Sequence, residues 1–363
     1  MKIAILSPPY LPVPPIGYGG TERIVYYLAE GLVKKGHEVT LFASGDSKTS
    51  AKLSATFEKS LGNSGELKGK TLLPLIQYAD CYSRANDFDI IHNHAQFLGL
   101  FFADFVNTPV VHTMHCTLYN DETTEEKIRT VTRFKNHKYI SISNNQREGQ
   151  KELNWIDTVY NGIDLNEYEF NQNKGEYLLW LGRITEKKGP VEAIETAKKI
   201  GIPLKMAAAI DPIDRPFYEE KVKPLIDGKF ISFLGELHGN EKSKLYASAL
   251  ATLYPISWHE PFGLVMAESM ATGTPVIAYN IGSVSEIVRD GVTGFIINQQ
   301  DKSVDLRIQS VGIEGLVEGV KRIGEINRND CRKWVEDNFT IEKMVDGYEK
   351  VYKNVISRQG VSI

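Results

Sequence analysis

Short apolar runs alternate with longer amphipathic stretches along the whole chain, which is the pattern of parallel strands joined by helices. In the first half, the runs that predict strands are residues 2–6, 38–43, 89–92, 109–113, 139–143 and 158–160. A helix is predicted from about Thr21, as its N-cap, to Lys35, with Gly36 as its stop. The first half therefore predicts one doubly wound α/β domain.

The same rhythm restarts in the second half of the chain. Strands are predicted at residues 177–181, 204–208, 230–234, 251–254, 275–278 and 294–297. The polar segment 166–176 that precedes them is interpreted as a linker. Residues 341–356 carry apolar side chains three and four positions apart, which predicts a helix with one buried stripe. We therefore predict an α/β fold of two Rossmann-like doubly wound domains, residues 1–165 and 177–340, facing across a cleft and followed by a C-terminal helix within residues 341–363.

Size and composition agree with this division. The chain has 363 residues, too many for one typical core, and its 42% hydrophobic and 24% charged residues are typical of globular proteins. The formal net charge of -4 argues against nucleic acid as a partner. Three distant cysteines, Cys81, Cys116 and Cys331, form no C-x-x-C pair and favour a reducing compartment. No segment approaches the ~20 apolar residues that cross a bilayer, so we expect a cytoplasmic protein.

One basic stretch departs from the even distribution of charge. It contains Lys127, Arg129, Arg133, Lys135 and Lys138. We interpret it as the solvated face of a helix, with a membrane or anionic-acceptor surface as the alternative. Any membrane contact is then expected to be peripheral, at the inner face.

The most informative segment is an E-x7-E element that runs from Glu260 to Glu268. If a helix begins near Pro261, the two carboxylates lie on nearly one helical face. The backbone amides of Phe262, Gly263 and Leu264 then form an anion site at the helix N-terminus. A sugar nucleotide needs this combination of amides for phosphate and carboxylates for hydroxyls. The alternative is an ordinary amphipathic helix with a negative N-terminus.

Two further segments place cations or glycines just before helices. Arg183 and Lys188 follow the first strand of the second half, where two cations can converge on one diphosphate. A polar turn with a salt bridge to Glu186 is the alternative. In the first half, Gly19 and Gly20 precede a helix and let the backbone approach a phosphate or sugar closely, although the dinucleotide spacing G-x-G-x-x-G is absent.

Four histidines lie at or just past the ends of predicted strands: His92, His94, His112 and His115. Their spacing matches no metal-ligand motif, and the D-x-D form at residues 87–89 precedes a strand rather than following one. We therefore predict no metal site. One histidine is expected to bind a sugar hydroxyl or steady charge at the reacting carbon, while the others satisfy polar groups of the core.

With these segments in order, the chain resembles the retaining glycosyltransferases of family 4, which have the GT-B fold. The resemblance covers nearly the whole length. It rests on residues 18–22, 112–115, 160–164 and 182–189 and on the E-x7-E element. The ordered set is much more specific than any one member.

The resemblance implies a donor site in the C-terminal half. Arg183 and Lys188 would bind the donor diphosphate, Glu268 the ribose, and Glu260 the transferred sugar. The amides of residues 262–264 would hold sugar and phosphate oxygens. The loop of Gly19 and Gly20 would close on the diphosphate from the opposite domain.

The resemblance also implies acceptor-side features. His115 matches the active-site histidine of the family, with His112 as the reserve choice, and the helix at 341–363 would pack back on the N-terminal domain. No cofactor is expected, because the nucleotide sugar is a substrate, with UDP as the expected nucleotide from the family's commonest usage. The acceptor, whether a glycan, a lipid or a small molecule, is left open.

In mechanism, the resemblance implies retention of anomeric configuration. The sequence offers no clearly placed nucleophile, which favours front-face substitution over double displacement, with electrostatic stabilisation of the leaving group carrying most of the rate. Two alternative functions stay open at this point: a nucleotide-sugar 2-epimerase and a non-catalytic protein that binds sugar nucleotides.

Overall fold

The computed structural model describes residues 1–62, 72–301 and 304–358 and divides into two compact units. Unit 1 comprises residues 1–162 and 341–363, and unit 2 comprises residues 163–340. Unit 1 is therefore discontinuous in sequence. The chain leaves it once and returns to it once.

Unit 1 is built on a seven-stranded sheet with the order β3-β2-β1-β4-β5-β6-β7, in which all paired strands are parallel. Its strands are β1 (Lys2–Leu6), β2 (Glu38–Phe42), β3 (Lys52–Ser54), β4 (Ile90–Asn93), β5 (Val110–Thr113), β6 (Lys138–Ser141) and β7 (Trp155–Thr158). The central strands are apolar and buried because helices cover a parallel sheet on both faces. The strand order reverses at β1, and ligands bind at such switch points, beyond the carboxyl ends of the strands.

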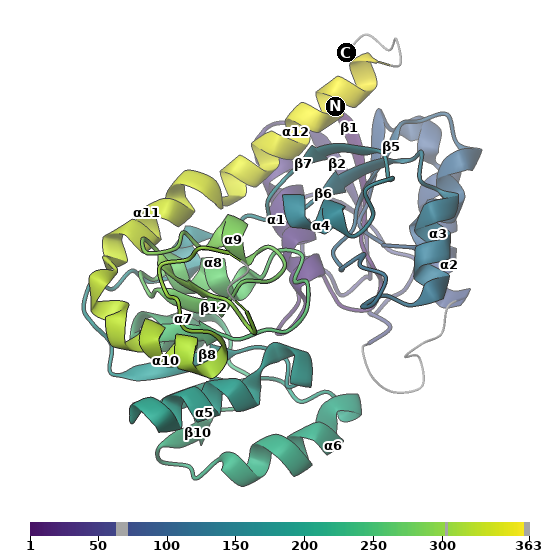
Figure 1. Ribbon diagram of the computed structural model, residues 1–363. Helices are drawn as coiled ribbons and strands as arrows, with labels where there is room; N and C mark the ends of the chain where they lie inside the picture. Colours follow the sequence, from purple (N-terminus) through teal and green to yellow (C-terminus); the bar gives the residue numbers. More distant parts are fainter. Residues whose placement is uncertain (63–71, 302–303, 359–363) are drawn as a thin grey trace. The chain divides into compact units, whose positions relative to one another are not determined.

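Helices and short helical turns connect these strands. They are α1 (Gly20–Lys34), α2 (Leu72–Ser83), η1 (Ala85–Asp87), η2 (Leu98–Phe105), α3 (Glu125–Arg133) and α4 (Asn144–Glu148). The helix α12 (Ile341–Ser357), the terminal yellow helix in Figure 1, packs against α1. Gly31 of α1 touches Val345 of α12, since a side chain at Gly31 would overlap the valine. The C-terminal helix thus completes the core of unit 1.

Unit 2 repeats the architecture with a six-stranded parallel sheet, in the order β10-β9-β8-β11-β12-β13. Its strands are β8 (Tyr177–Leu181), β9 (Leu204–Ala207), β10 (Ile231–Phe233), β11 (Ala249–Tyr254), β12 (Val276–Tyr279) and β13 (Gly294–Ile297). The order reverses between β8 and β11. The loops that follow these two strands therefore lie at the switch point of this sheet.

The helical elements of unit 2 include several short turns. They are η3 (Leu165–Glu167), η4 (Glu186–Lys188), α5 (Pro190–Ile200), η5 (Pro212–Asp214), α6 (Arg215–Phe217), η6 (Tyr218–Val222), η7 (Lys223–Leu225), α7 (Gly239–Ala247), α8 (Leu264–Ala271), α9 (Val284–Ile287), α10 (Gly312–Arg322), η8 (Ile323–Glu325) and α11 (Arg328–Asn338). In Figure 1, α10 and α5 are neighbours, and α11 packs on α8.

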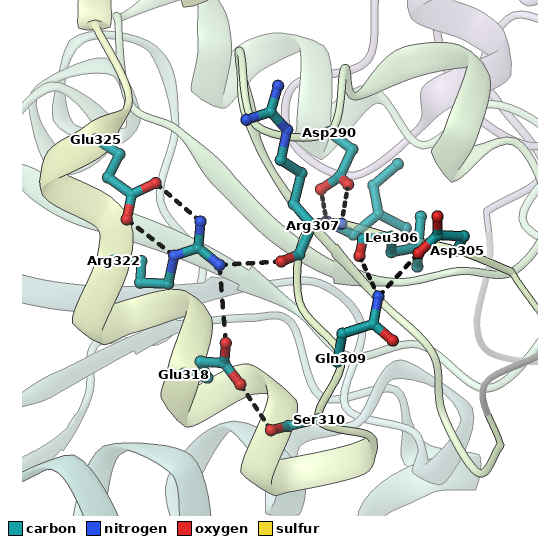
Figure 2. Close-up of polar contacts among 10 residues, drawn as sticks. Asp290, Asp305, Leu306, Arg307, Gln309, Ser310, Glu318, Arg322 and Glu325 are labelled. Carbon is teal, nitrogen blue, oxygen red and sulfur yellow. Dashed lines mark hydrogen bonds and ion pairs between the residues drawn. The ribbon is translucent and has the colours of Figure 1, made fainter.

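A surface network holds Arg307, which lies before α10 (Figure 2). Arg322 donates to Glu325 at 2.8 Å and to the backbone carbonyl of Arg307 at 2.9 Å. The N–H of Arg307 in turn donates to Asp290 at 2.8 Å. These groups hold each other at the surface, and we assign the network a structural role.

Three local expectations need correction. The helix predicted from Thr21 begins at Gly20, and its N-cap is Gly19 rather than Thr21. The helix predicted near Pro261 begins only at Leu264, because Gly263 before it has a left-handed backbone, with φ 79°. The strand predicted at residues 158–160 lies at Trp155–Thr158, and the short edge strand β3 was not predicted.

The polar segment 166–176 is hydrogen-bonded into unit 2. The N–H of Asn171 donates to the carbonyl of Thr272 at 3.0 Å, and its side chain donates to the carbonyl of Ala247 at 2.9 Å. Arg328 of α11 donates to the carbonyl of Asn171 at 2.7 Å. Nowhere in residues 1–62, 72–301 and 304–358 is there a helix both long and apolar enough to cross a bilayer.

Candidate functional site

Lys188 and Glu260 meet at the switch point of the unit 2 sheet. Lys188 ends η4, after β8, and Glu260 lies in the loop after β11, and the two side chains form an ion pair. The Tyr254 hydroxyl also donates to the Glu260 carboxylate, at 2.8 Å. The Lys188 ammonium lies 4.7 Å from the centre of the Trp258 ring, a cation–π distance. Lys188, the residue predicted to bind the diphosphate, and Glu260, the residue predicted to bind the sugar, are therefore neighbours.

Backbone contacts hold the two loops together. Ser257 donates its N–H to the carbonyl of Lys187 at 2.9 Å. Gly189 has a left-handed backbone, with φ 66°, and a side chain there would overlap the carbonyl oxygen of Pro255. Gly282 also approaches this loop closely, since a Cβ there would lie 2.5 Å from the Glu260 nitrogen. Glycine is required at both positions because no larger residue leaves room for these approaches.

Gly263 sets the position of the α8 N-terminus beside Glu260. A Cβ at Gly263 would lie 3.3 Å from Glu260 Cγ, 3.1 Å from the Tyr254 hydroxyl and 2.6 Å from Met266 Cε. The first N–H groups of any α-helix lack intrahelical acceptors and carry a partial positive charge. At this end they include Leu264, with Gly263 as the N-cap. An anion site at residues 262–264 is thus compatible with the later helix start, although Glu260 is outside the helix and shares no helical face with Glu268.

Glu268 lies one turn into α8 and is almost fully buried, at 4% exposure. It accepts from Lys242 at 2.7 Å and from the Tyr246 hydroxyl at 2.9 Å, both on α7. Burial alone would raise the pKa of the Glu268 carboxyl. The charge of Lys242 and the hydrogen bonds that it and two tyrosines donate outweigh burial, and the pKa lies below its ordinary value. Glu268 is therefore an anion with a fixed orientation.

Arg183 follows β8 and binds carboxylates from a neighbouring loop. Its guanidinium donates to Asp214 and lies 3.9 Å from Asp211, both at the turn η5. The alternative expected from sequence was a salt bridge to Glu186. The structure instead pairs Arg183 with two aspartates about 30 residues further along the chain, and it leaves the side chain about one third exposed.

In unit 1 the predicted histidines form a cluster at the carboxyl ends of β4 and β5. His94 Nδ1 lies 2.8 Å from His115 Nε2, and His94 Nε2 lies 3.1 Å from His92 Nδ1. His112 instead bonds to the Asn93 amide at 2.9 Å. Burial lowers the pKa of His115 to about 4. It also lowers the pKa of His92, His94 and His112 well below the ordinary value.

The glycine loop lies at the start of α1, beyond β1. Gly19 has φ 147° and touches Leu11 and Pro15, where a Cβ would lie 2.8 Å from either side chain. Glu22, in the first turn of α1, is buried at 7% exposure. Burial raises the pKa of the Glu22 carboxyl to about 7, against a weaker opposing backbone hydrogen bond. At the start of α1, the closely packed backbone of Gly19 is thus followed by the Glu22 carboxyl, which can be protonated and neutral near pH 7.

The structure thus collects Lys188, Glu260 and Gly263 into one group and anchors Glu268 and Arg183 to other partners. Sequence reasoning missed those partners: Tyr254, Trp258, Lys242, Tyr246, Asp211 and Asp214. Only Tyr254, at the carboxyl end of a predicted strand, carried a positional signal. Within the part of the chain that the structure describes, no group of three or more His, Cys, Asp or Glu side chains is arranged to hold a metal ion.

Comparison with known proteins places this geometry in a family. The model of Glycosyltransferase Family 4 matches residues 18–167, and the model of the glycosyl transferases group 1 matches residues 165–312. An uncharacterized glycosyltransferase of Methanocaldococcus jannaschii is 24% identical, over 99% of this chain and 100% of that protein.

Solved structures show the same fold over nearly the whole chain. Sucrose-phosphate synthase from Thermosynechococcus elongatus superposes with a TM-score of 0.78 and 19% identity, over 98% of this chain and 99% of that one. Anabaena HepE in complex with UDP and glucose superposes with a TM-score of 0.75 and 18% identity, over 98% and 100%. The matched families, the two parallel-sheet units and these neighbours agree, and the chain belongs to glycosyltransferase family 4 and has the GT-B fold.

Proposed function

We propose that this glycosyltransferase moves a sugar, with retention of configuration and without a metal ion, from a UDP-sugar to an acceptor hydroxyl. The observation that carries the proposal is the Lys188–Glu260 pair beside the N-terminus of α8. A cation, a carboxylate and the first N–H groups of a helix suit a phosphate and a sugar bound side by side. The choice of UDP is supported by HepE, whose structure contains UDP and glucose.

In the proposed site, each charged group has one task. Lys188 neutralises the departing diphosphate, Glu260 binds hydroxyls of the transferred sugar, and Glu268 accepts from the ribose. Arg183 joins Lys188 on the diphosphate by exchanging the aspartates of η5 for phosphate oxygens. The N–H groups of residues 262–264 bind sugar or phosphate oxygens. In unit 1, Gly19 and Gly20 are the proposed contacts of a phosphate or sugar, and His115 is the proposed contact of a sugar or acceptor hydroxyl.

The proposed chemistry is front-face substitution. The bond between the anomeric carbon and the β-phosphate oxygen breaks, and the acceptor oxygen bonds to the same face of that carbon. The leaving phosphate takes the acceptor proton, so no protein base is needed. Lys188 and the α8 amides stabilise the charge that builds on the phosphate, which is where preorganised groups accelerate such reactions most. These fixed positive groups also make a divalent cation dispensable in the proposal.

A thermal-shift screen with UDP-, GDP- and ADP-sugars, each with EDTA or with added Mg²⁺ or Mn²⁺, tests the donor and the metal claims together. A ligand at 100 times its Kd stabilises by about 2.7 kcal/mol, and we expect this shift for a UDP-sugar with EDTA present. A shift that needs added Mg²⁺ or Mn²⁺ would contradict metal independence. A shift with GDP- or ADP-sugars alone would contradict the choice of UDP.

The fate of the bound donor separates the reaction types. The protein is incubated with the donor that stabilises it, and the products are monitored by NMR. We expect slow release of UDP. An isomerised sugar nucleotide would instead indicate a 2-epimerase. Tight binding with neither release nor transfer to any acceptor would indicate a protein that only binds the donor.

A further inference from the structure

The buried histidines of unit 1 form a continuous line of imidazoles that ends at His115. His92 is at the carboxyl end of β4, His94 follows it, and His115 follows β5. The contacts of 3.1 Å from His92 to His94 and 2.8 Å from His94 to His115 are hydrogen-bond distances. His92 and His94 are fully buried, whereas His115 is partly exposed. The line therefore runs from the core toward the surface.

Helix α12 closes the buried end of this line. The Tyr352 hydroxyl lies 2.6 Å from His92 Nδ1, and the Thr113 hydroxyl lies 2.8 Å from His92 Nε2. Thr113 also donates to the Tyr348 hydroxyl at 3.3 Å. A residue of the C-terminal helix thus touches the first imidazole, more than 200 positions away in sequence.

These contacts select one protonation pattern. Among the described residues, His92 Nδ1 is the hydrogen-bond partner of the Tyr352 hydroxyl, so a proton on Nδ1 would leave a buried O–H without an acceptor. His92 therefore carries its proton on Nε2 and donates to Thr113, which can then donate to Tyr348. The single lone pair of Nδ1 accepts from the Tyr352 hydroxyl at 2.6 Å and is shared with the longer contact of 3.1 Å from His94 Nε2.

The pattern continues from one imidazole to the next, because a neutral imidazole has one donor nitrogen and one acceptor nitrogen. His94 donates from Nε2 to His92, so its Nδ1 is an acceptor. His115 must then donate from Nε2 to His94 Nδ1. The remaining nitrogen of His115, Nδ1, is left as an acceptor.

We propose that Tyr352 and His94 are positioning residues that hold His115 as its Nε2–H tautomer and so present His115 Nδ1 as a hydrogen-bond acceptor. The proposal deepens the proposed function, on which the catalytic role of His115 rests. A neutral His115 in this state accepts a hydrogen bond from a sugar or acceptor hydroxyl and offers no donor at that nitrogen. It orients a hydroxyl rather than protonating a leaving group.

Geometry and burial both support a neutral, fixed imidazole. The His94 and His115 rings are stacked within 21°, with centres 5.1 Å apart. The His92 ring contacts the rings of Tyr348 and Tyr352, with centres 4.9 and 5.5 Å away. Burial keeps the pKa of His115 near 4, so the ring is uncharged at neutral pH. At neutral pH, His115 can therefore differ only in which of its two ring nitrogens carries the proton.

The test is ¹⁵N NMR of the full chain labelled at histidine, which distinguishes Nδ1–H from Nε2–H imidazoles. In the wild type, His115 should be the Nε2–H tautomer. Tyr352→Phe removes only the hydroxyl, and the reversed pattern along the line then becomes accessible, so an Nδ1–H signal of His115 should appear. Tyr82→Phe is the matched control, since it removes a buried hydroxyl of unit 1 that donates to the Gly99 carbonyl and takes no part in the line, and it should leave the His115 tautomer unchanged.

A second variant keeps the test decisive. His94→Gln breaks the path between His92 and His115, so adding Tyr352→Phe to it should cause no further change at His115. An Nδ1–H His115 in the wild type, or a His115 signal unaffected by Tyr352→Phe in a folded protein, would overturn the proposal.

Turnover separates this proposal from the proposed function. Hydrolysis of UDP-glucose without acceptor should show a several-fold lower kcat in Tyr352→Phe, with KM little changed. A tautomer shift with unchanged kcat would retain the positioning role of Tyr352 and His94 and contradict the part that His115 plays in the proposed reaction. A lower kcat with no tautomer shift would overturn the positioning role.

Discussion

Lys188 and Glu260 neutralise each other at a place where a substrate would need both charges. Exposed ion pairs contribute little to stability, but this pair is largely enclosed, with the lysine 21% and the glutamate 13% exposed. Aromatic faces of Trp258 and Tyr254 surround the ammonium. A phosphate that arrives here finds a lysine already stripped of most of its water, and the electrostatic attraction is correspondingly strong.

We predict that Lys188→Ala lowers transfer by roughly 10²-fold or more with the fold intact, because it removes charge stabilisation of the leaving diphosphate. Arg183→Ala should act in the same direction and to a similar extent. The measurement is initial rate with the donor that shifts in the thermal screen.

Lys187→Ala is the matched control, since Lys187 is the exposed neighbour in the same turn. It should retain wild-type turnover. Unchanged turnover in both Lys188→Ala and Arg183→Ala would remove the basis of the donor assignment.

For Glu268, the sequence predicted a ligand role but not the side chains that hold its carboxylate. Its place in the E-x7-E element marked it as a ligand, but nothing near it in sequence indicated that Lys242 and Tyr246 would hold its carboxylate. The two partners come from α7, a separate helix. Side chains from different elements meet through packing, which a local pattern does not encode.

At the scale of elements, α8 begins where Gly263 permits. Pro261 is well suited to a first helical turn, and this preference led to the earlier start predicted from sequence. The carbonyls of Glu260 and Phe262 instead accept from the N–H and the hydroxyl of Ser283. These bonds hold the loop in a non-helical path until the left-handed glycine turns the chain into the helix.

We predict that Gly263→Ala both destabilises the protein and weakens donor binding. The substitution carries the ~1–2 kcal/mol cost of a left-handed alanine and in addition pushes on Met266, Tyr254 and Glu260. Gly235→Ala is the matched control, because Gly235 has a similar φ of 73° but no atom within 4 Å of its Cβ position.

Both variants should lower the unfolding midpoint, measured by calorimetry, and only Gly263→Ala should raise the donor Kd, measured by titration calorimetry. Equal donor affinity in the two variants would mean that the α8 N-terminus takes no part in donor binding.

Long buried strands were the most predictable elements, because their continuous apolar runs reflect burial on both faces of a parallel sheet. The runs at Lys2–Leu6 and Gly294–Ile297 were found at full length. The three-residue strand β3 was not predicted at all, since its Lys52–Ser54 segment is polar at both ends and lies at the sheet edge. Edge strands need little apolar surface and so leave a weak pattern.

At the scale of the whole molecule, the histidines couple stability to pH. His92, His94, His112 and His115 have folded pKa values below the unfolded value of about 6.5. The unfolded chain therefore binds more protons in acid, and stability rises with pH through this range. The stabilising effect of the neutral histidines is full above about pH 6.5 and is lost as pH falls toward the folded values, about 4 for His115.

We predict that the urea unfolding free energy falls between pH 7 and pH 5, by up to ~1.4 kcal/mol per pH unit for each histidine concerned. His115→Asn should make this dependence shallower. His238→Asn, at an exposed position of unit 2, should leave it as in the wild type. A slope that His115→Asn does not change would show that His115 is not kept neutral by folding.

Unit 1 is assembled from two stretches of chain that flank unit 2 in sequence, and this determines the order in which the two units can fold during synthesis. A ribosome has made all of unit 2, up to Thr340, before it makes α12, on which the core of unit 1 and the hydrogen bond from Tyr352 to His92 both depend. The unit encoded second can therefore be the first to finish folding. The nascent chain cannot fix the state of His115 until residue 352 has emerged, so a stalled or shortened product would carry a formed second unit beside an unfinished first.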